Sequence, residues 1–132
     1  MRNFDKDHSL VRIINAIPKS RGLDINLNGK TLFRDISFTD FTPYVYMPPG
    51  EYLLEVYTSQ DKTEPIFKKD IKIGKDKLLS LAIAGNEDEK ISLVRMKDDK
   101  EPPEDNTMSK VRFVHLVPNG KPVNILLDGK TY

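Results

Sequence analysis

Apolar and β-branched residues alternate with polar residues over short stretches of this chain, and turn residues interrupt them about every eight to twelve positions. This spacing is typical of a β-sandwich or barrel, and no segment has the period of a long amphipathic helix. The first segment, 10–17, is apolar on both faces in places, which predicts a strand covered on both sides. The pattern predicts an all-β, antiparallel sandwich of seven or eight strands drawn from residues 10–17, 23–27, 31–33, 36–38, 44–47, 51–58, 66–73, 78–84 and 91–96.

The segment 23–27 shows the alternation most clearly. Every second residue from Leu23 onward is apolar and is expected to point into the core, so that Asp24 points away from it. Asn28 and Gly29 follow directly, and this pair predicts a two-residue hairpin of type I′, because both central positions of that turn need a positive φ.

Residues 109–132 repeat residues 9–32 with an offset of 100 and no gap. SLVRIINAIPKSRGLDINLNGKTL aligns with SKVRFVHLVPNGKPVNILLDGKTY, so that the copies share Arg12 and Arg112, Pro18 and Pro118, and Gly29 and Gly129. A period of about 100 residues exceeds that of solenoid repeats and fits a complete domain in tandem. We therefore predict a sandwich unit at 1–96, followed by the first hairpin of a second, incomplete unit at 109–132, with strands at 111–117 and 123–127.

The segment 97–108 separates the two copies. It is charged, contains two prolines and lacks aliphatic anchors apart from Met108, as is typical of an exposed linker. Its acidic residues, Asp98 among them, are expected to be solvated.

Composition excludes several partners and chemistries. Lys and Arg number 21 against 20 Asp and Glu, so no global field attracts nucleic acid or anionic lipid. No apolar run reaches the length of a membrane span or forms a secretory signal, and we expect no membrane insertion. The absence of cysteine excludes disulfides, thiol nucleophiles and cysteine-ligated zinc.

Three elements of the first copy carry a family resemblance: VRIINAIP, LDINLNGKTLF and DFTPYVYMPPGEYLLEVY. They resemble the bacterial family catalogued as domain of unknown function 4397. The positions that fit its pattern are Arg12, Pro18, Asp24, Gly29, Tyr44, Gly50 and Tyr52, and Arg112, Pro118 and Gly129 continue it in the second copy.

The resemblance implies an immunoglobulin-like β-sandwich, often in tandem, on secreted, surface or otherwise envelope-associated bacterial proteins. It implies no known enzymatic activity, and a fold shared by many functions supplies none by analogy. We therefore expect no catalytic residue, no cofactor and no enzyme. The compartment stays open, since the chain shows no signal peptide of its own.

A calcium loop is the most specific candidate site. Asp24, Asn26 and Asn28, with Asp35 at the twelfth place, nearly reproduce the D-x-N-x-N-G loop with its closing acid. The flanks are predicted strands, and Leu126 replaces Asn26 in the second copy, where it cannot bind a cation. A solvated strand face ending in a hairpin is the interpretation we favour, and no metal is expected.

Tyrosines provide the candidate ligand contacts. Tyr44, Tyr46 and Tyr57 are candidates for a sugar-stacking face, with packing on the sheet as the alternative that their strand spacing favours. The hydroxyl of Tyr44 or Tyr52 is also a candidate to anchor a turn, as in a tyrosine corner.

An arginine recurs between apolar neighbours in both copies, as Arg12 and Arg112. This placement predicts an ion pair at a buried edge with a carboxylate such as Asp24. The two histidines, His8 and His115, lie far apart in different copies, which argues against a metal site or a general base.

The leading hypothesis is a non-enzymatic structural or binding module of a bacterial surface, secreted or envelope protein, with a protein or glycan partner. Loops at 18–22, 59–64 and 85–89 are the expected contacts, since loops on a rigid scaffold commonly carry recognition. A carbohydrate-binding module is one alternative. The other is a self-assembling subunit in which the hairpin at 109–132 adds a strand to a sheet edge in the same chain or in another.

Overall fold

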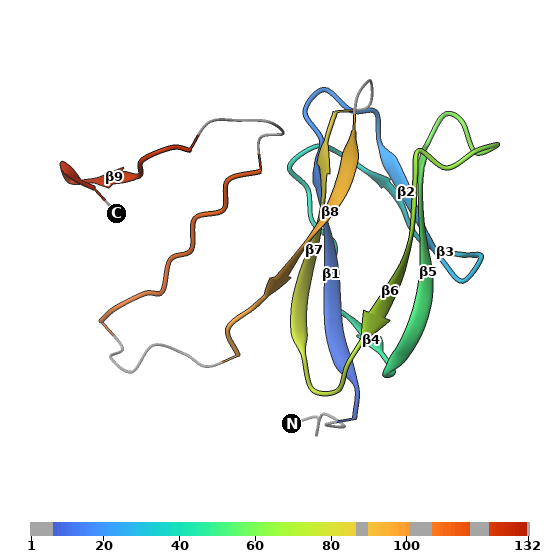
Figure 1. Ribbon diagram of the computed structural model, residues 1–132, viewed down its shortest axis with the longest axis horizontal. Helices are drawn as coiled ribbons and strands as arrows, with labels where there is room; N and C mark the ends of the chain where they lie inside the picture. The colour runs from blue at the N-terminus through green and yellow to red at the C-terminus, as the bar shows by residue number, and fades with distance from the viewer. Residues whose placement is uncertain (1–6, 87–89, 101–106, 117–121, 132) are drawn as a thin grey trace.

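Two four-stranded sheets lie face to face in the computed structural model, which describes residues 7–86, 90–100, 107–116 and 122–131 (Figure 1). One sheet has the order β4-β1-β7-β8 and the other the order β3-β2-β5-β6. The predicted all-β sandwich is confirmed. Its strands are β1 (Ser9–Ala16), β2 (Leu23–Leu27), β3 (Lys30–Ile36), β4 (Val45–Met47), β5 (Gly50–Thr58), β6 (Phe67–Ile73), β7 (Leu78–Gly85) and β8 (Ile91–Lys97).

The prediction of purely antiparallel pairing is wrong at one place. β1 pairs with β7 in parallel, from Leu10 opposite Leu78 to Ala16 opposite Ala84, while the other pairs in both sheets are antiparallel. The first strand thus lies at the centre of its sheet, between β4 and β7. Alternation along a strand reveals which residues face the core but not the direction of the neighbouring strand, which is set by the path of the chain.

The separate strand predicted at 36–38 does not form. β3 continues to Ile36, and the chain then leaves the sheet to cross over to β4 in the other sheet. Thr39 adopts a positive φ of 76° and its N–H donates to the carbonyl of Asn15 at 2.9 Å. The segment is therefore a crossing between the sheets.

The core lies between the sheets and contains the predicted inward-facing residues. Leu23 and Ile25 of β2 are fully buried, as are Leu54 and Val56 of β5. Asn15 is the polar residue at the centre of this region: its amide donates to the carbonyl of Ile36 at 2.9 Å, and its Oδ1 accepts the N–H of Ile17 at 3.0 Å. Asn15 thereby ties β1 of one sheet to the end of β3 in the other.

Both predicted hairpins are present and share one geometry. Asn28 and Gly29 have φ of 50° and 82°, and Asp128 and Gly129 have φ of 50° and 78°, as a type I′ turn requires. The second hairpin joins β9 (Leu126–Leu127) to β10 (Lys130–Thr131), with the same register as its counterpart.

The other strands expected in the second copy are largely missing. Residues 111–116 form no strand, and the segment predicted at 123–127 is a strand only at its last two residues. The equivalent β1 is hydrogen-bonded on both sides, by β4 and β7. No such neighbours flank 111–116 in the described part of the chain, and an extended segment without them has no ladder to join.

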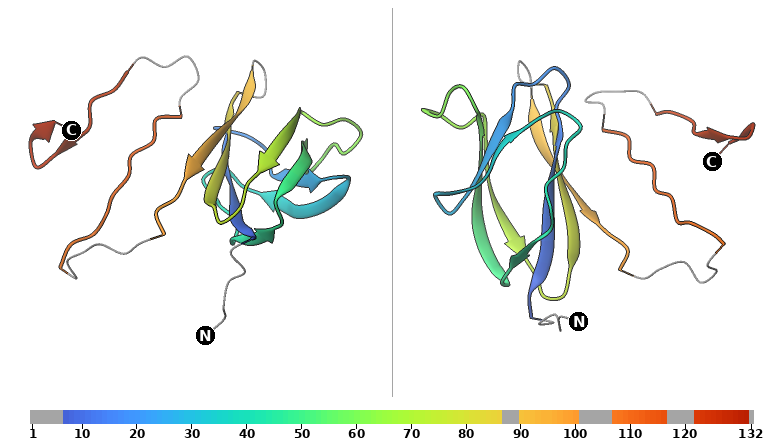
Figure 2. Two further views of the ribbon diagram at one scale, coloured as in Figure 1. Left: turned by 60° about the horizontal axis from the view of Figure 1, so that its bottom comes forward. Right: turned by 180° about the vertical axis from the view of Figure 1, so that it is seen from behind.

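The segment 107–116 extends along one side of the sandwich. In Figures 1 and 2 it lies beside the sheet that contains β1, β7 and β8, and away from the sheet that contains β2 and β5. It rises in the same direction as β1 (Figure 1). Among the described residues, no helix is long and apolar enough to cross a membrane.

Candidate functional site

A buried carboxylate at the end of β8 is the centre of a dense polar cluster. Asp98 follows β8 directly and is only 8% exposed. Its N–H donates to the carbonyl of Leu78 at 2.7 Å, which continues the pairing of β8 with β7 by one residue. The expectation that Asp98 is a solvated linker acid is therefore wrong, because the sheet extends past the predicted boundary and Lys97 itself belongs to β8.

The Asp98 cluster joins four other side chains, from β1, β7, the residue before β4 and the second copy. Oδ2 of Asp98 accepts the hydroxyl of Ser80 at 2.6 Å and that of Tyr44 at 2.5 Å. Nη2 of Arg112 donates to Oδ1 at 2.6 Å. Arg12 donates from Nε to Ser80 Oγ at 2.7 Å and lies 3.8 Å from Oδ2. The two repeat-equivalent arginines thus meet at one carboxylate.

Sequence reasoning anticipated an ion pair for Arg12 but assigned it the wrong acid. Arg12 pairs with Asp98, whereas Asp24 pairs with Lys62 at 3.3 Å. Asp98 lies 86 positions from Arg12 along the chain, and only the parallel pairing of β1 with β7 brings Ser80, and with it the end of β8, beside Arg12.

Aromatic rings hold the guanidinium of Arg12 in place. It lies 5.0 Å from the ring centre of Phe41 and 4.9 Å from that of Tyr44. Rings within about 6 Å of a cation attract it through the negative potential of their faces. The stack orients Arg12 so that Nε meets Ser80.

The charge states within the cluster follow from its contacts. Burial acts to raise the pKa of Asp98, but hydrogen bonds from Ser80, Tyr44 and Arg112, together with the charge of Arg12, outweigh it and lower the pKa below the usual value. Burial and the hydrogen bond to Asp98 raise the pKa of Tyr44. Asp98 is therefore ionised and Tyr44 protonated at neutral pH, an arrangement suited to holding charges in place rather than to transferring protons.

The first calcium candidate, Asp24, is buried and has protein partners. Its Oδ1 accepts the N–H of Asp35 and the hydroxyl of Ser59, both at 2.9 Å. Burial acts to raise the pKa of Asp24, and these hydrogen bonds with the nearby Lys62 outweigh it, so that the pKa is lowered. Asp24 thus fixes the loop after β5 to β2 and β3, and the expectation of a solvated position is wrong.

The other calcium candidates are also part of the sheet. Oδ1 of Asn28 accepts the N–H of Leu53 at 2.8 Å. Asn26 lies opposite Glu55 in the pairing of β2 with β5, and Asp35 lies within β3. Within the described residues, no three His, Asp or Glu side chains gather closely enough to hold a metal ion.

The three predicted contact loops lie at one end of the sandwich. The β1–β2 and β5–β6 loops, with the described ends of the β7–β8 loop, gather at the top of Figure 1. Arg21 of the first loop donates to Oε1 of Gln60 in the second at 2.5 Å. Residues 87–89 of the third predicted loop lie outside the described residues.

The tyrosine candidates are divided between the two sheets. Tyr46 lies opposite Leu10 in the pairing of β1 with β4, and Tyr57 lies opposite Asp24 in the other sheet. Tyr44 belongs to the Asp98 cluster, and the Tyr57 hydroxyl donates to Glu55 at 3.2 Å. The three candidates therefore do not form a single stacking platform.

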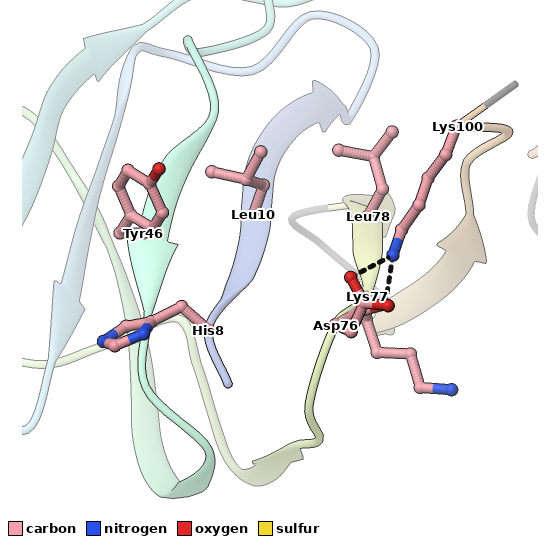
Figure 3. Close-up of a pocket in the computed structure, with 7 residues that line it drawn as sticks. All are labelled: His8, Leu10, Tyr46, Asp76, Lys77, Leu78 and Lys100. Carbon is pink, nitrogen blue, oxygen red and sulfur yellow. Dashed lines mark hydrogen bonds and ion pairs between the residues drawn. The ribbon is translucent and has the colours of Figure 1, made fainter. Parts of the chain in front are cut away.

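Tyr46 borders a cavity of about 290 Å³ beside β1 (Figure 3). Its ring meets the ring of His8 edge to face, with the centres 5.9 Å apart. On the far side, Nζ of Lys100 lies 2.6 Å from Oδ1 of Asp76. Apolar side chains form the floor between these groups, namely Leu10 and Leu78 (Figure 3).

The remaining motif residues shape turns. The hydroxyl of Tyr52 donates to the carbonyl of Pro48 at 2.6 Å, which fixes the turn before β5, where Gly50 has a φ of 153°. This contact confirms the prediction that a tyrosine anchors a turn. Pro18 lies in the loop after β1, and its counterpart Pro118 lies outside the described residues.

Sequence reasoning missed Asp98 and Ser80 as members of the central cluster. Ser80 is buried between apolar neighbours in β7, and Arg12 is half-buried between apolar neighbours in β1. A polar residue within an apolar strand is the signal that marks Ser80, since buried polar groups need partners. Nothing in the composition of the charged segment distinguishes Asp98 from Asp99.

Comparison with known proteins identifies a family that matches most of the chain. The family model described as a domain of unknown function, DUF4397, matches residues 9–126. The match runs without interruption from β1 through the charged segment to the start of the second hairpin. No curated protein matches the sequence.

Proposed function

Because the chain belongs to the DUF4397 family of domains of unknown function, we propose that it is a non-enzymatic structural or binding module of a bacterial surface, secreted or envelope protein. The module works by presenting loops on a rigid sandwich. The gathering at one end of the loops at 18–22 and 59–64, with the described ends of the β7–β8 loop, is the observation that carries this proposal (Figure 1).

The anchoring of these loops supports the proposal. Oδ1 of Asp24 accepts the hydroxyl of Ser59 at 2.9 Å, and the Ser59 N–H donates to the carbonyl of Gly22 at 2.8 Å. The Arg21–Gln60 contact joins the same two loops at their exposed side. A surface held by such contacts is ordered before a partner arrives, which lowers the entropic cost of binding.

Cell fractionation combined with a binding assay tests the proposal. We expect the tagged full chain in the envelope or medium of the bacterium that encodes it, and the purified chain on the surface of those cells. The double variant Arg21→Ala/Gln60→Ala is expected to bind about tenfold more weakly, as loss of an interface centre typically costs over 1 kcal/mol. Lys75→Ala, in the turn at the opposite end, is the matched control. A purely cytoplasmic protein that binds no cell-surface material would refute the proposal.

A carbohydrate-binding module is the second candidate, and the cavity beside Tyr46 favours it (Figure 3). Tyr46 is 40% exposed, and an exposed aromatic ring across a cavity from a carboxylate and an ammonium group offers both stacking and hydrogen bonds to a sugar. Glycan-array binding that is lost in Tyr46→Ala and kept in Tyr57→Ala would support this candidate. Equal binding by both variants, or no binding to any cell-wall polysaccharide, would count against it.

A further inference from the structure

Side chains on the outer face of the β4-β1-β7-β8 sheet are less exposed than expected for a sheet face in contact with solvent. Leu79, Leu81 and Ile83 of β7 belong to the core, so the residues between them point outward. Two of these outward residues, Ser80 and Ala82, are nonetheless 0% exposed. Along β1, the outward residues between Val11 and Ile17 are all half-buried. The first strand is thus shielded on both sides, as its apolar pattern predicts.

The segment 107–116 lies beside this face and contacts the sandwich through Arg112 and Leu116. Arg112 reaches Asp98 at 2.6 Å and also donates to the carbonyl of Lys97 at 2.9 Å. Lys110 pairs at 2.7 Å with Asp99, an exposed residue of the charged segment beyond β8. Leu116 lines an apolar cavity of about 300 Å³, together with Ile14, Asn15, Ala16, Pro18, Phe38 and Thr39.

The contacts of the segment with the sandwich fall mainly on even positions. Arg112 and Leu116 meet the sandwich, whereas Val111 and Phe113 are 70% and 52% exposed. Val111 also borders the hollow beside Arg12 and Tyr44. The shared parity of Arg112 and Leu116 is that of one face of an extended segment. In the alignment, the inward-facing set corresponds to the outer face of β1 and the exposed set to its core face.

Equivalent positions lie close together across the contact. Arg112 shares Asp98 with Arg12, and Leu116 lines the same cavity as Ala16. At these two positions the segment lies near its own counterparts, and it rises in the same direction as β1, at an angle to it (Figure 1). When two extended segments run in the same direction and each turns the same face toward the other, a two-fold rotation about an axis parallel to them relates the two. This is the geometry of an isologous interface, in which both partners use the same surface.

We infer that the outer face of the β4-β1-β7-β8 sheet is a homotypic docking surface that receives a second copy of the same unit, back to back, through the same face. The occupant is the second copy in the same chain, whose opening segment already lies beside this face at 107–116. Asp98 is the central contact of this surface, since it binds the arginine of its own unit and that of the next. The exposed Val111 and Phe113 then form the core face of the second sandwich.

The inference rests on the proposed structural role, but its test is independent of cellular location. The chain has no cysteine, so two introduced cysteines report their own proximity. The full-length double variant Ala16→Cys/Leu116→Cys pairs two residues that line one cavity. Lys68→Cys/Leu116→Cys is the control, since Lys68 is exposed on β6 in the other sheet.

We expect mild oxidation to close an intramolecular disulfide in the 16/116 variant and not in the 68/116 control, as read by thiol titration and by monomer mobility on non-reducing gels. Adding Arg112→Asp is expected to slow closure by roughly fivefold, since it replaces an ion pair worth up to ~1 kcal/mol with a like-charge contact. Adding Lys130→Asp, in the distant hairpin, is expected to leave the rate unchanged. Thermal unfolding of the reduced variants verifies that each is folded.

Two results would overturn the inference. Equal closure in the 16/116 and 68/116 variants would show that 107–116 has no preferred face. Disulfides formed only between chains would show that this segment covers a neighbouring molecule by exchange, as the self-assembly alternative holds. Cell fractionation, by contrast, tests only the proposed function.

Discussion

β1 and the segment 109–116 share an alternating pattern, with the same residue at three of eight positions, but have opposite surroundings. Val11 and Ile13 of β1 are 2% and 3% exposed, whereas their counterparts Val111 and Phe113 are 70% and 52% exposed. β1 has a strand on either side and a second sheet above its core face. The segment 109–116 has the same alternation but no neighbouring strands among the residues that the structure describes. The alternating pattern therefore specifies which residues share a face, and a segment becomes a strand only where another strand pairs with it.

The comparison predicts a large difference between matched core truncations. Ile13→Ala is expected to lower the free energy of unfolding by about 4 kcal/mol, through lost burial and the cavity it leaves. Phe113→Ala removes a larger side chain but is expected to change it by less than about 0.5 kcal/mol, because an exposed side chain leaves no cavity. Urea denaturation of both variants measures the difference, and comparable losses would show that 109–116 is packed into a core.

Much of the sandwich is predictable from the sequence, because apolar core residues alternate with polar residues within each strand and turn residues separate the strands. The strand at 23–27 and the hairpin turns at Asn28 and Asp128 need only local information. The parallel partner of β1 and the partners of Arg12 depend on which strands the chain brings together, which no local pattern records. Asp98 was placed in a solvated linker for that reason, although it lies at the centre of the polar cluster.

Asp98 links the two regions, and its removal should have the next largest effect. Asp98→Ala is expected to cost about 3 kcal/mol, since it leaves Ser80, Tyr44 and the cationic groups without their common acceptor. The pKa of Asp98 is lower in the folded chain than in the unfolded chain, where it is near 4. Ionised Asp98 therefore stabilises the fold at pH values above the unfolded pKa, and this stabilisation is lost as the pH falls through the folded pKa.

The pH dependence provides the check on that prediction. Between about pH 5 and pH 2, where a carboxylate of this kind titrates, we expect the wild-type chain to lose more stability than Asp98→Ala. Parallel curves for the two proteins would show that Asp98 does not titrate differently on folding. Urea midpoints measured across this range, with Asp99→Ala as the matched exposed control, decide the matter.

The two arginines that bind Asp98 should differ in their contributions. Arg12→Met is expected to cost about 1.5 kcal/mol, because it loses the Ser80 hydrogen bond and the stacking on Phe41 and Tyr44. Arg112→Met is expected to cost at most about 0.5 kcal/mol, since its guanidinium belongs to a largely exposed pair that adds little to global stability. Thermal unfolding separates the two, and a larger loss for Arg112→Met would reverse their assigned roles.

The two hairpins give the smallest and most closely matched contrast. Gly29 and Gly129 have φ of 82° and 78°, and neither has an atom within 4 Å of an added Cβ, so backbone strain is the whole cost of alanine at either position. Gly29→Ala is expected to lower the free energy of unfolding by about 1 kcal/mol, because the β2–β3 hairpin folds with the sandwich. Gly129→Ala, in a hairpin of two-residue strands outside the core, is expected to leave the global transition unchanged. Amide exchange at Leu127 and Lys130 should instead rise in that variant, and an equal drop in melting temperature for both variants would mean that the second hairpin unfolds together with the first unit.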